Sequence, residues 1–78
     1  MNGRSEMTPE QSFFSVFCIE SLSDALDIPG NKIYKKLTEE SDILDNYVIT
    51  YYDSLHTQGK EYIVSKLIEL MKEQGVQI

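Results

Sequence analysis

Apolar residues recur every three or four positions along most of this 78-residue chain, and that helical period constrains the fold more than any other feature. The segment Thr8-Pro9-Glu10-Gln11 predicts a helix start, since the threonine can cap, the proline suits the first helical position and the glutamine completes a capping box. The run from Phe13 to Ile28 then predicts a helix of about five turns that is apolar on more than one face and buried at its start. Pro29-Gly30 ends this helix.

The middle of the chain predicts two further helices. Residues 31–40 resume the helical pattern, with Ile33, Tyr34 and Leu37 facing inward and the lysines outward. Seven apolar residues then fall on one face of a helix: Ile43, Leu44, Tyr47, Val48, Tyr51, Tyr52 and Leu55. Within that segment, residues 47–52 are β-branched and aromatic and favour a strand by local propensity, so both interpretations stay open there.

The last part of the chain reads as a turn and a helix. Thr57-Gln58-Gly59 predicts the turn, and the apolar residues from Tyr62 to Met71 predict the helix, which Gly75 closes. The sequence therefore predicts an all-α fold, a single compact domain of about four helices over residues 8–78. Residues 1–7 lack an apolar period and predict a disordered leader.

Composition excludes several classes of site. With one cysteine, Cys18, and one histidine, the chain can form neither an internal disulfide nor a thiolate-rich zinc site, and we expect no metal and no cofactor. Cys18 lies in the most apolar segment and is expected in the core. A net charge of −6 argues against a general phosphate-binding surface and an anionic membrane as partner. We see no signal peptide or membrane span, so we expect a cytoplasmic protein.

One basic segment interrupts the acidic chain. Residues 29–38 carry a charge of +3, whereas residues 1–28 carry −4 and residues 39–55 carry −5. Together with the preceding helix, this segment resembles a helix-turn-helix pair, whose second helix would contact DNA. The residues that would face bases and phosphates are Asn31, Lys32, Lys35 and Lys36. Against this stand the acidic flanks and the lack of an arginine there for bidentate guanine contact.

A second candidate site combines the only histidine with tyrosines. Tyr51, Tyr52, His56 and Tyr62 lie close together in sequence, and tyrosine is favoured at protein interfaces. The acidic 39–45 segment could extend such a surface. His56 could act as a general base, but no ordered acid or nucleophile accompanies it. A plainer role is that His56 and Thr57 cap the last helix or fix the turn by hydrogen bonds.

The segment Tyr52-Asp53-Ser54-Leu55-His56-Thr57-Gln58-Gly59-Lys60-Glu61-Tyr62-Ile63 resembles the Tyr-Asp-x-Leu-His-Thr-Gln-Gly-x-Glu-Tyr-Ile motif of a family of small uncharacterised bacterial proteins, a domain of unknown function common in gut Firmicutes and their relatives. Phe13–Ile19 and Ile33–Leu37 match its Phe-rich first helix and its Ile/Val-Tyr-x-x-Leu helix, so the resemblance covers about residues 12–75. The family's genes often lie beside genes for proteins resembling ADP-ribosyltransferases. The resemblance therefore implies an accessory or antitoxin-like partner role, and it assigns no functional residue.

From these features we expect a non-enzymatic, cytoplasmic protein-interaction module that binds another protein or itself. The alternative is a helix-turn-helix DNA-binding regulator that uses the basic helix at residues 31–38.

Overall fold

The computed structural model describes residues 8–78, and these residues form helices and connecting segments without a strand. Residues 1–7, where the sequence predicts a disordered leader, lie outside the described part of the chain. The all-α prediction is confirmed, with five helical segments in place of about four. In chain order they are α1 (Pro9–Leu26), α2 (Gly30–Thr38), η1 (Leu44–Ile49), α3 (Tyr52–Leu55) and α4 (Lys60–Glu73).

The ends of α1 follow the local signals in the sequence. Thr8 accepts a hydrogen bond from the Gln11 amide, and the Gln11 side chain accepts one from the Thr8 amide, so the predicted capping box forms. At the other end Asp27 adopts a left-handed conformation with φ 56° and ψ 44°. The Ile28 amide donates to the Ser23 carbonyl, and the Ser23 hydroxyl donates to the Ile28 carbonyl. Side-chain and backbone hydrogen bonds thus close the helix before Pro29.

The segment with conflicting helix and strand signals is helical. It forms the π-helix η1, which has a wider turn than an α-helix, and then breaks at residues 50–51 before α3. The helical interpretation of residues 47–49 is therefore confirmed, but not as one continuous α-helix. Ile43, Leu44, Val48 and Leu55 are buried as predicted, whereas Tyr51 is 53% exposed.

The last helix ends as its sequence predicts. Gly75 has φ 76°, its amide donates to the Lys72 carbonyl, and the Val76 amide donates to the Met71 carbonyl. These two bonds form a Schellman motif, in which glycine avoids the steric cost of a left-handed residue. Val76 is buried behind this cap, so the motif also folds the tail onto the core.

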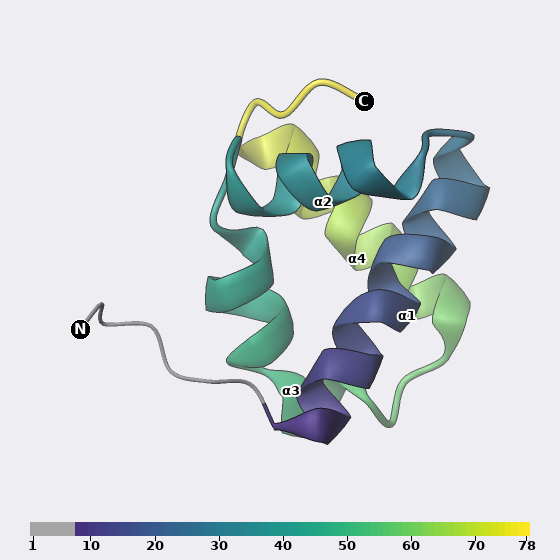
Figure 1. Ribbon diagram of the computed structural model, residues 1–78, viewed down its shortest axis with the longest axis vertical. Helices are drawn as coiled ribbons and strands as arrows, with labels where there is room; N and C mark the ends of the chain where they lie inside the picture. The colour runs from purple at the N-terminus through teal and green to yellow at the C-terminus, as the bar shows by residue number, and fades with distance from the viewer. Residues whose placement is uncertain (1–7) are drawn as a thin grey trace.

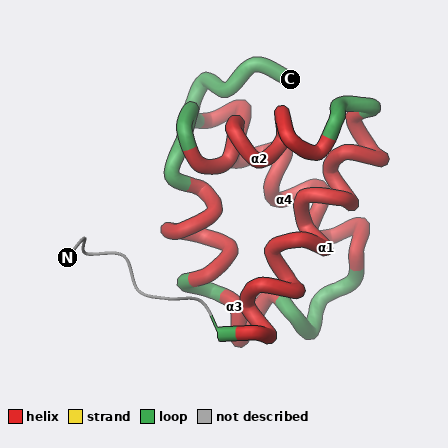
Figure 2. Tube along the Cα trace, in the orientation of Figure 1, coloured by secondary structure: helices red, strands yellow, loops and turns green. Residues whose placement is uncertain are grey.

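One core joins all five helical segments. Helix α1 packs against α2, η1 and α4, as Figures 1 and 2 show, with α2 crossing one end of the bundle and α3 lying at the other. Helices α1 and α4 contribute three buried apolar residues each, and Cys18 is fully buried in the core, as expected. The buried apolar residues are Phe14, Cys18, Leu22, Ile33, Leu37, Ile43, Leu44, Val48, Leu55, Ile63, Leu67, Met71 and Val76.

Two predictions about orientation are wrong. Tyr34, expected to face inward, is 49% exposed, because the short α2 buries only Ile33 and Leu37, one turn apart. The start of α1, expected to be buried, keeps Phe13 and Val16 exposed, because the other helices cover one face of α1 only.

Candidate functional site

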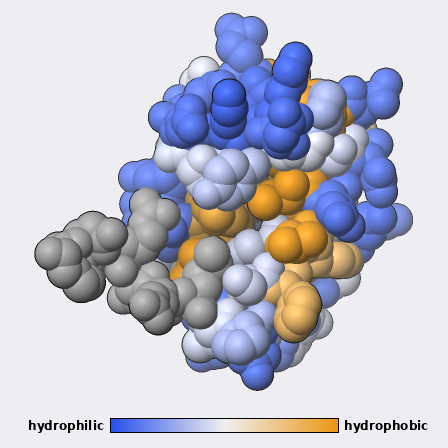
Figure 3. Space-filling model, viewed as in Figure 1, coloured by the Kyte–Doolittle hydropathy of each residue, from blue (hydrophilic) through white to orange (hydrophobic). Residues whose placement is uncertain are grey.

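Helix α1 carries two apolar faces, and only one is used for the core. Phe14, Cys18 and Leu22 point inward, while Phe13, Val16 and Phe17 are 76%, 51% and 40% exposed. We call the latter three residues the α1 apolar surface. They are spaced i, i+3 and i+4, so they share one side of the helix. In Figure 3 apolar side chains gather over the middle of the face that includes α1, with hydrophilic side chains above them.

A row of ring contacts joins this surface to α3. The ring of Phe17 stacks on Phe14, with centroids 6.1 Å apart, and Phe14 meets Tyr52 edge to face at 5.5 Å. Tyr52 in turn stacks on His56, with centroids 4.6 Å apart. Phe14 is buried, Tyr52 is half-buried and His56 is exposed. The row therefore passes through the edge of the core and reaches the solvent at both ends.

The predicted tyrosine–histidine site falls into two groups. Tyr52 and His56 belong to the row above, whereas Tyr51 contacts Tyr47 with ring centroids 5.5 Å apart. Tyr62 lies near this second pair, because it acts electrostatically on Tyr47. Burial raises the pKa of Tyr47, the charges of Tyr62 and Tyr51 raise that pKa further, and the charge of Lys66 lowers it. Tyr51 and Tyr62 are 53% and 47% exposed, so both groups present rings to solvent.

The turn before α4 is not closed by a side-chain cap. Gly59 occupies the N-cap position without a side-chain hydrogen bond, and the Thr57 hydroxyl instead donates to the Ser54 carbonyl at 3.0 Å. Thr57 therefore fixes the turn to α3, which agrees with the expectation that it ties the turn down. His56 contributes its ring to Tyr52, an interaction that the sequence did not indicate.

The lysines of α2 differ in how far their side chains are exposed to solvent. Asn31, Lys32 and Lys35 are exposed, but only 16% of the Lys36 side chain is exposed and its Nζ lies 3.9 Å from a Glu40 carboxylate oxygen. Glu40, Glu39 and Asp42 are exposed directly beyond the helix. Acids therefore adjoin the residues that the sequence suggested for DNA contact.

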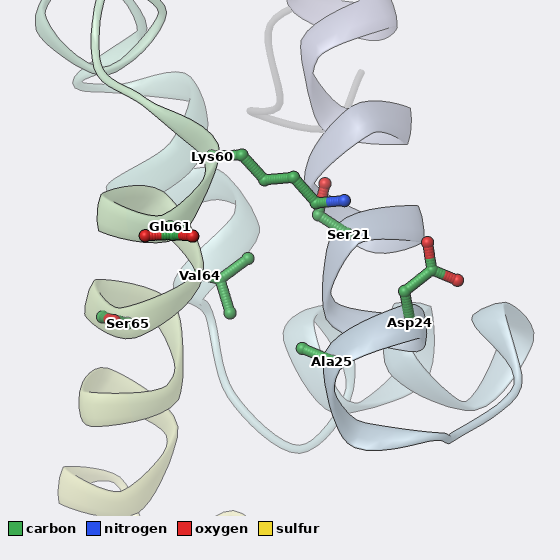
Figure 4. Close-up of a pocket in the computed structure, with 7 residues that line it drawn as sticks. All are labelled: Ser21, Asp24, Ala25, Lys60, Glu61, Val64 and Ser65. Atoms are coloured by element: carbon green, nitrogen blue, oxygen red, sulfur yellow. The ribbon is translucent and has the colours of Figure 1, made fainter.

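A hollow of about 530 Å³ lies between α1 and α4 (Figure 4). Its apolar and small lining consists of Ala25, Val64 and Ser65, and Ser21 also lines it although it is only 4% exposed. Three charged residues complete the lining: Asp24 on α1, and Lys60 and Glu61 on α4. In Figure 4 the Lys60 side chain extends from α4 toward Ser21 on α1.

The described residues contain neither a metal-binding group nor a reactive thiol. Within residues 8–78 no group of three His, Cys, Asp or Glu side chains is placed to hold a metal ion. Burial raises the pKa of Cys18 to about 12, so its thiol stays protonated and unreactive at neutral pH. No helix in this part of the chain has the length and apolar content needed to cross a bilayer.

Comparison with known proteins places the chain in a family. The family described as "Protein of unknown function (DUF3791)" matches residues 13–74, which include α1 from Phe13 onward, all of α2, η1, α3 and α4. The chain belongs to this family. No curated protein and no solved structure matches it.

The sequence missed the α1 apolar surface and the hollow. The sequence does contain a signal for the α1 apolar surface, because the run from Phe13 to Ile19 is apolar on more than one side. Apolar residues are normally assigned to the core, and the sequence does not say which face the other helices cover. No local pattern indicated the hollow, since its lining residues come from α1 and α4, which meet only in the folded chain.

Proposed function

We propose that this member of the family is a non-enzymatic, cytoplasmic protein-interaction module whose partner docks on the α1 apolar surface. The observation that carries the proposal is the exposure of Phe13, Val16 and Phe17 on one side of a helix that is already packed on its other side. Single exposed apolar residues are common, but three at i, i+3 and i+4 form the anchor pattern of helix-mediated recognition.

The ring row extends the proposed contact area to α3. Tyr52 and His56 continue the surface from Phe17 through Phe14, and rigid aromatic rings bind at a low cost in conformational entropy. Of the residues expected from the sequence, Tyr52 and His56 therefore belong to this proposed interface. Tyr51 and Tyr62, grouped with Tyr47, form a separate exposed pair that a large partner could also reach.

The charges beside the α1 apolar surface favour binding of a different protein over binding of a second copy of this chain. Glu10 and Glu20 are exposed on α1, three residues before Phe13 and three residues after Phe17. A two-fold dimer would place this patch against itself and bring these carboxylates together. Like charges facing one another disfavour such contact, whereas lysines or arginines on a partner would attract the carboxylates. We therefore assign the surface to a partner with an apolar segment bordered by basic residues.

An accessory or antitoxin-like role would fit this chemistry. Residues 52–63 resemble the motif of a family whose genes often lie beside genes for ADP-ribosyltransferase-like proteins, and that resemblance suggests such an enzyme as the partner. The enzymatic alternative through His56 has less support, because its ring stacks on Tyr52 and no acid or nucleophile of a catalytic set contacts it among the described residues. The DNA-binding alternative is weakened by the acids beside Lys36.

The test compares a double variant of the α1 apolar surface with a control variant at another exposed aromatic residue. The wild-type chain, the double variant Phe13→Ser/Val16→Ser and the control Tyr34→Ser are immobilised and incubated with nuclease-treated host lysate, and circular dichroism verifies each fold. We expect a stoichiometric protein on the wild type and the control. With that protein purified, the double variant should bind about tenfold or more weakly by calorimetry, since buried aromatic and apolar anchors dominate such interfaces.

Three outcomes would overturn the assignment. The first is equal binding of the partner by the double variant. The second is a wild-type dimer in light scattering that Phe13→Ser/Val16→Ser dissociates, which would assign the surface to a second copy. The third is recovery of DNA alone, lost on nuclease treatment and reduced by Lys32→Ala/Lys35→Ala, which would favour the regulator.

A further inference from the structure

A second hollow, of about 230 Å³, lies between η1 and α4, and we call it the η1–α4 groove. Its apolar part is formed by Tyr47 and Leu70, which are half-buried and pack against the core. The charged residues of its lining, Lys66, Glu69 and Glu73, all lie on α4. Lys66 Nζ lies 3.5 Å from a Glu69 carboxylate oxygen, whereas Glu73 forms no ion pair within residues 8–78. The groove therefore keeps a carboxylate available beside an apolar surface.

Exposed tyrosine rings adjoin this groove. Tyr51 contacts Tyr47 with ring centroids 5.5 Å apart, and Tyr62 acts electrostatically on Tyr47. Both Tyr51 and Tyr62 are exposed. The face of a tyrosine ring attracts an ammonium group, and carboxylates attract it by their charge. The groove and its surroundings therefore favour a segment that combines basic side chains with an aromatic one.

The chain itself carries such a segment on α2, which crosses one end of the bundle (Figure 1). Lys32 and Lys35 are exposed one turn apart, and neither forms an ion pair within the described part of the chain. Tyr34, next to Lys35, is 49% exposed. We call these three residues the α2 basic surface. Residues 29–38 hold three lysines and no acid, so this surface belongs to the one basic segment of an otherwise acidic chain.

We propose that the α2 basic surface of one molecule docks on the η1–α4 groove of a second copy of this chain. Lys32 and Lys35 pair with Glu69 and Glu73, which are likewise one turn apart on their helix, so the two spacings match. Tyr34 packs against the apolar part of the groove. Since neither surface includes the α1 apolar surface, this self-association goes beyond the proposed function and leaves α1 free for its partner.

The contact is head to tail, because two different surfaces meet. Each dimer keeps one free groove and one free α2 basic surface, so further copies can add and the mass can exceed that of a dimer. The net charge of −6 opposes association at long range, but at about 0.1 M salt charges more than about 10 Å apart are largely screened. The contact is small, so we expect a dissociation constant between about 10 μM and 1 mM.

Analytical ultracentrifugation of the full chain measures this association. The mass of the wild type should rise with concentration and pass that of a dimer. The variants Lys32→Gln/Lys35→Gln and Glu69→Gln/Glu73→Gln should each weaken association by about fivefold to tenfold, since two solvent-exposed ion pairs are lost. The first variant makes the chain more negative and the second less negative, so an effect of net charge alone would change association in opposite directions.

An equimolar mixture of the two variants gives the sharpest test. Each variant keeps the surface that the other lacks, so the mixture should form a 1:1 dimer with the affinity of the wild type and grow no further. The control Asp24→Asn/Glu61→Gln removes the same charge from the α1–α4 hollow and should associate like the wild type. Circular dichroism verifies each fold. A wild type that stays monomeric up to about 1 mM, a mixture that stays monomeric, or a control that weakens equally would each overturn the proposal.

Failure here is separable from failure of the interaction module. Phe13→Ser/Val16→Ser should self-associate like the wild type, because it leaves the groove and α2 intact. If that double variant dissociates the oligomer, the contact lies on α1 and the head-to-tail assignment is overturned. A monomeric wild type that still binds its partner through the α1 apolar surface would leave the proposed function in place.

Discussion

The imidazole of His56 lies nearly parallel to the ring of Tyr52, with ring centroids 4.6 Å apart and planes inclined by 12°. Tyr52 also packs edge to face on the buried Phe14, so it connects an exposed ring to the core. The two members of the stack therefore differ in what they support. Loss of the exposed His56 ring leaves the core covered, whereas loss of the Tyr52 ring exposes Phe14 to solvent.

Truncation should separate these roles. His56→Ala should lower the free energy of unfolding by less than about 1 kcal/mol, since only one exposed stacking contact is lost. Tyr52→Ala should lower it by about 2–3 kcal/mol, because a half-buried aromatic ring leaves the edge of the core. Urea unfolding followed by circular dichroism measures both. Tyr51→Ala, an exposed neighbour, serves as the control and should resemble His56→Ala; equal losses for Tyr52 and His56 would contradict this account.

The left-handed residue that ends α1 offers a stabilising substitution. Asp27→Gly should raise the free energy of unfolding by about 0.5–1 kcal/mol, because glycine adopts φ 56° without the steric cost of a side chain and the change removes a negative charge at a helix C-terminus. Thermal and urea unfolding provide the measurement. The matched control Glu20→Gly places glycine in the interior of the same helix and should cost about 1 kcal/mol. If Asp27→Gly destabilises to the same degree, the left-handed cap does not govern this end.

The free energy of unfolding should fall at alkaline pH because the Cys18 thiol is buried. Burial raises the pKa of Cys18 from 9.0 to about 12. Below pH 9 the thiol is protonated in both states, but between pH 9 and about 12 only the unfolded chain loses the proton. The free energy of unfolding then decreases with pH, by at most about 1.4 kcal/mol per unit for this group.

A cysteine-free variant isolates the contribution of the Cys18 thiol from every other effect of alkaline pH. Cys18→Ala should be less stable than wild type at pH 7, because it leaves a small cavity, and the difference should narrow above pH 9. Urea unfolding at a series of pH values measures the two chains side by side. A difference that stays constant up to pH 11 would show that the thiol titrates alike in both states.

Helix ends could be predicted from sequence because their causes are local. The Thr8–Gln11 capping box, the stop at Pro29-Gly30 and the closure at Gly75 each depend on a few adjacent residues, and all three are confirmed. The choice between helix and strand at residues 47–52 was harder, since propensity opposed periodicity and packing decided for helix.

The exposed surfaces could not be predicted in the same way. Periodicity identified Phe13, Phe17 and Tyr34 as apolar, but burial depends on which helix covers them, and each remains substantially exposed. Of the tyrosine–histidine group suggested by the sequence, Tyr52 and His56 contact each other, while Tyr51 contacts Tyr47. Asp24 and Glu61 line the same hollow only because α1 packs on α4, and these residues are 37 positions apart in the sequence.

The π-helix η1 bears on how many residues other family members can have in this segment. A π-helical turn contains one residue more than an α-helical turn. The segment Leu44–Ile49 is therefore equivalent to an α-helical segment with one inserted residue. In an α-helix, one added residue rotates everything downstream by about 100°. Here the wide turn and the break at residues 50–51 absorb that rotation, and Leu55 still reaches the core. Family members one residue shorter at this point could therefore keep α4, and the hollow beside it, in place.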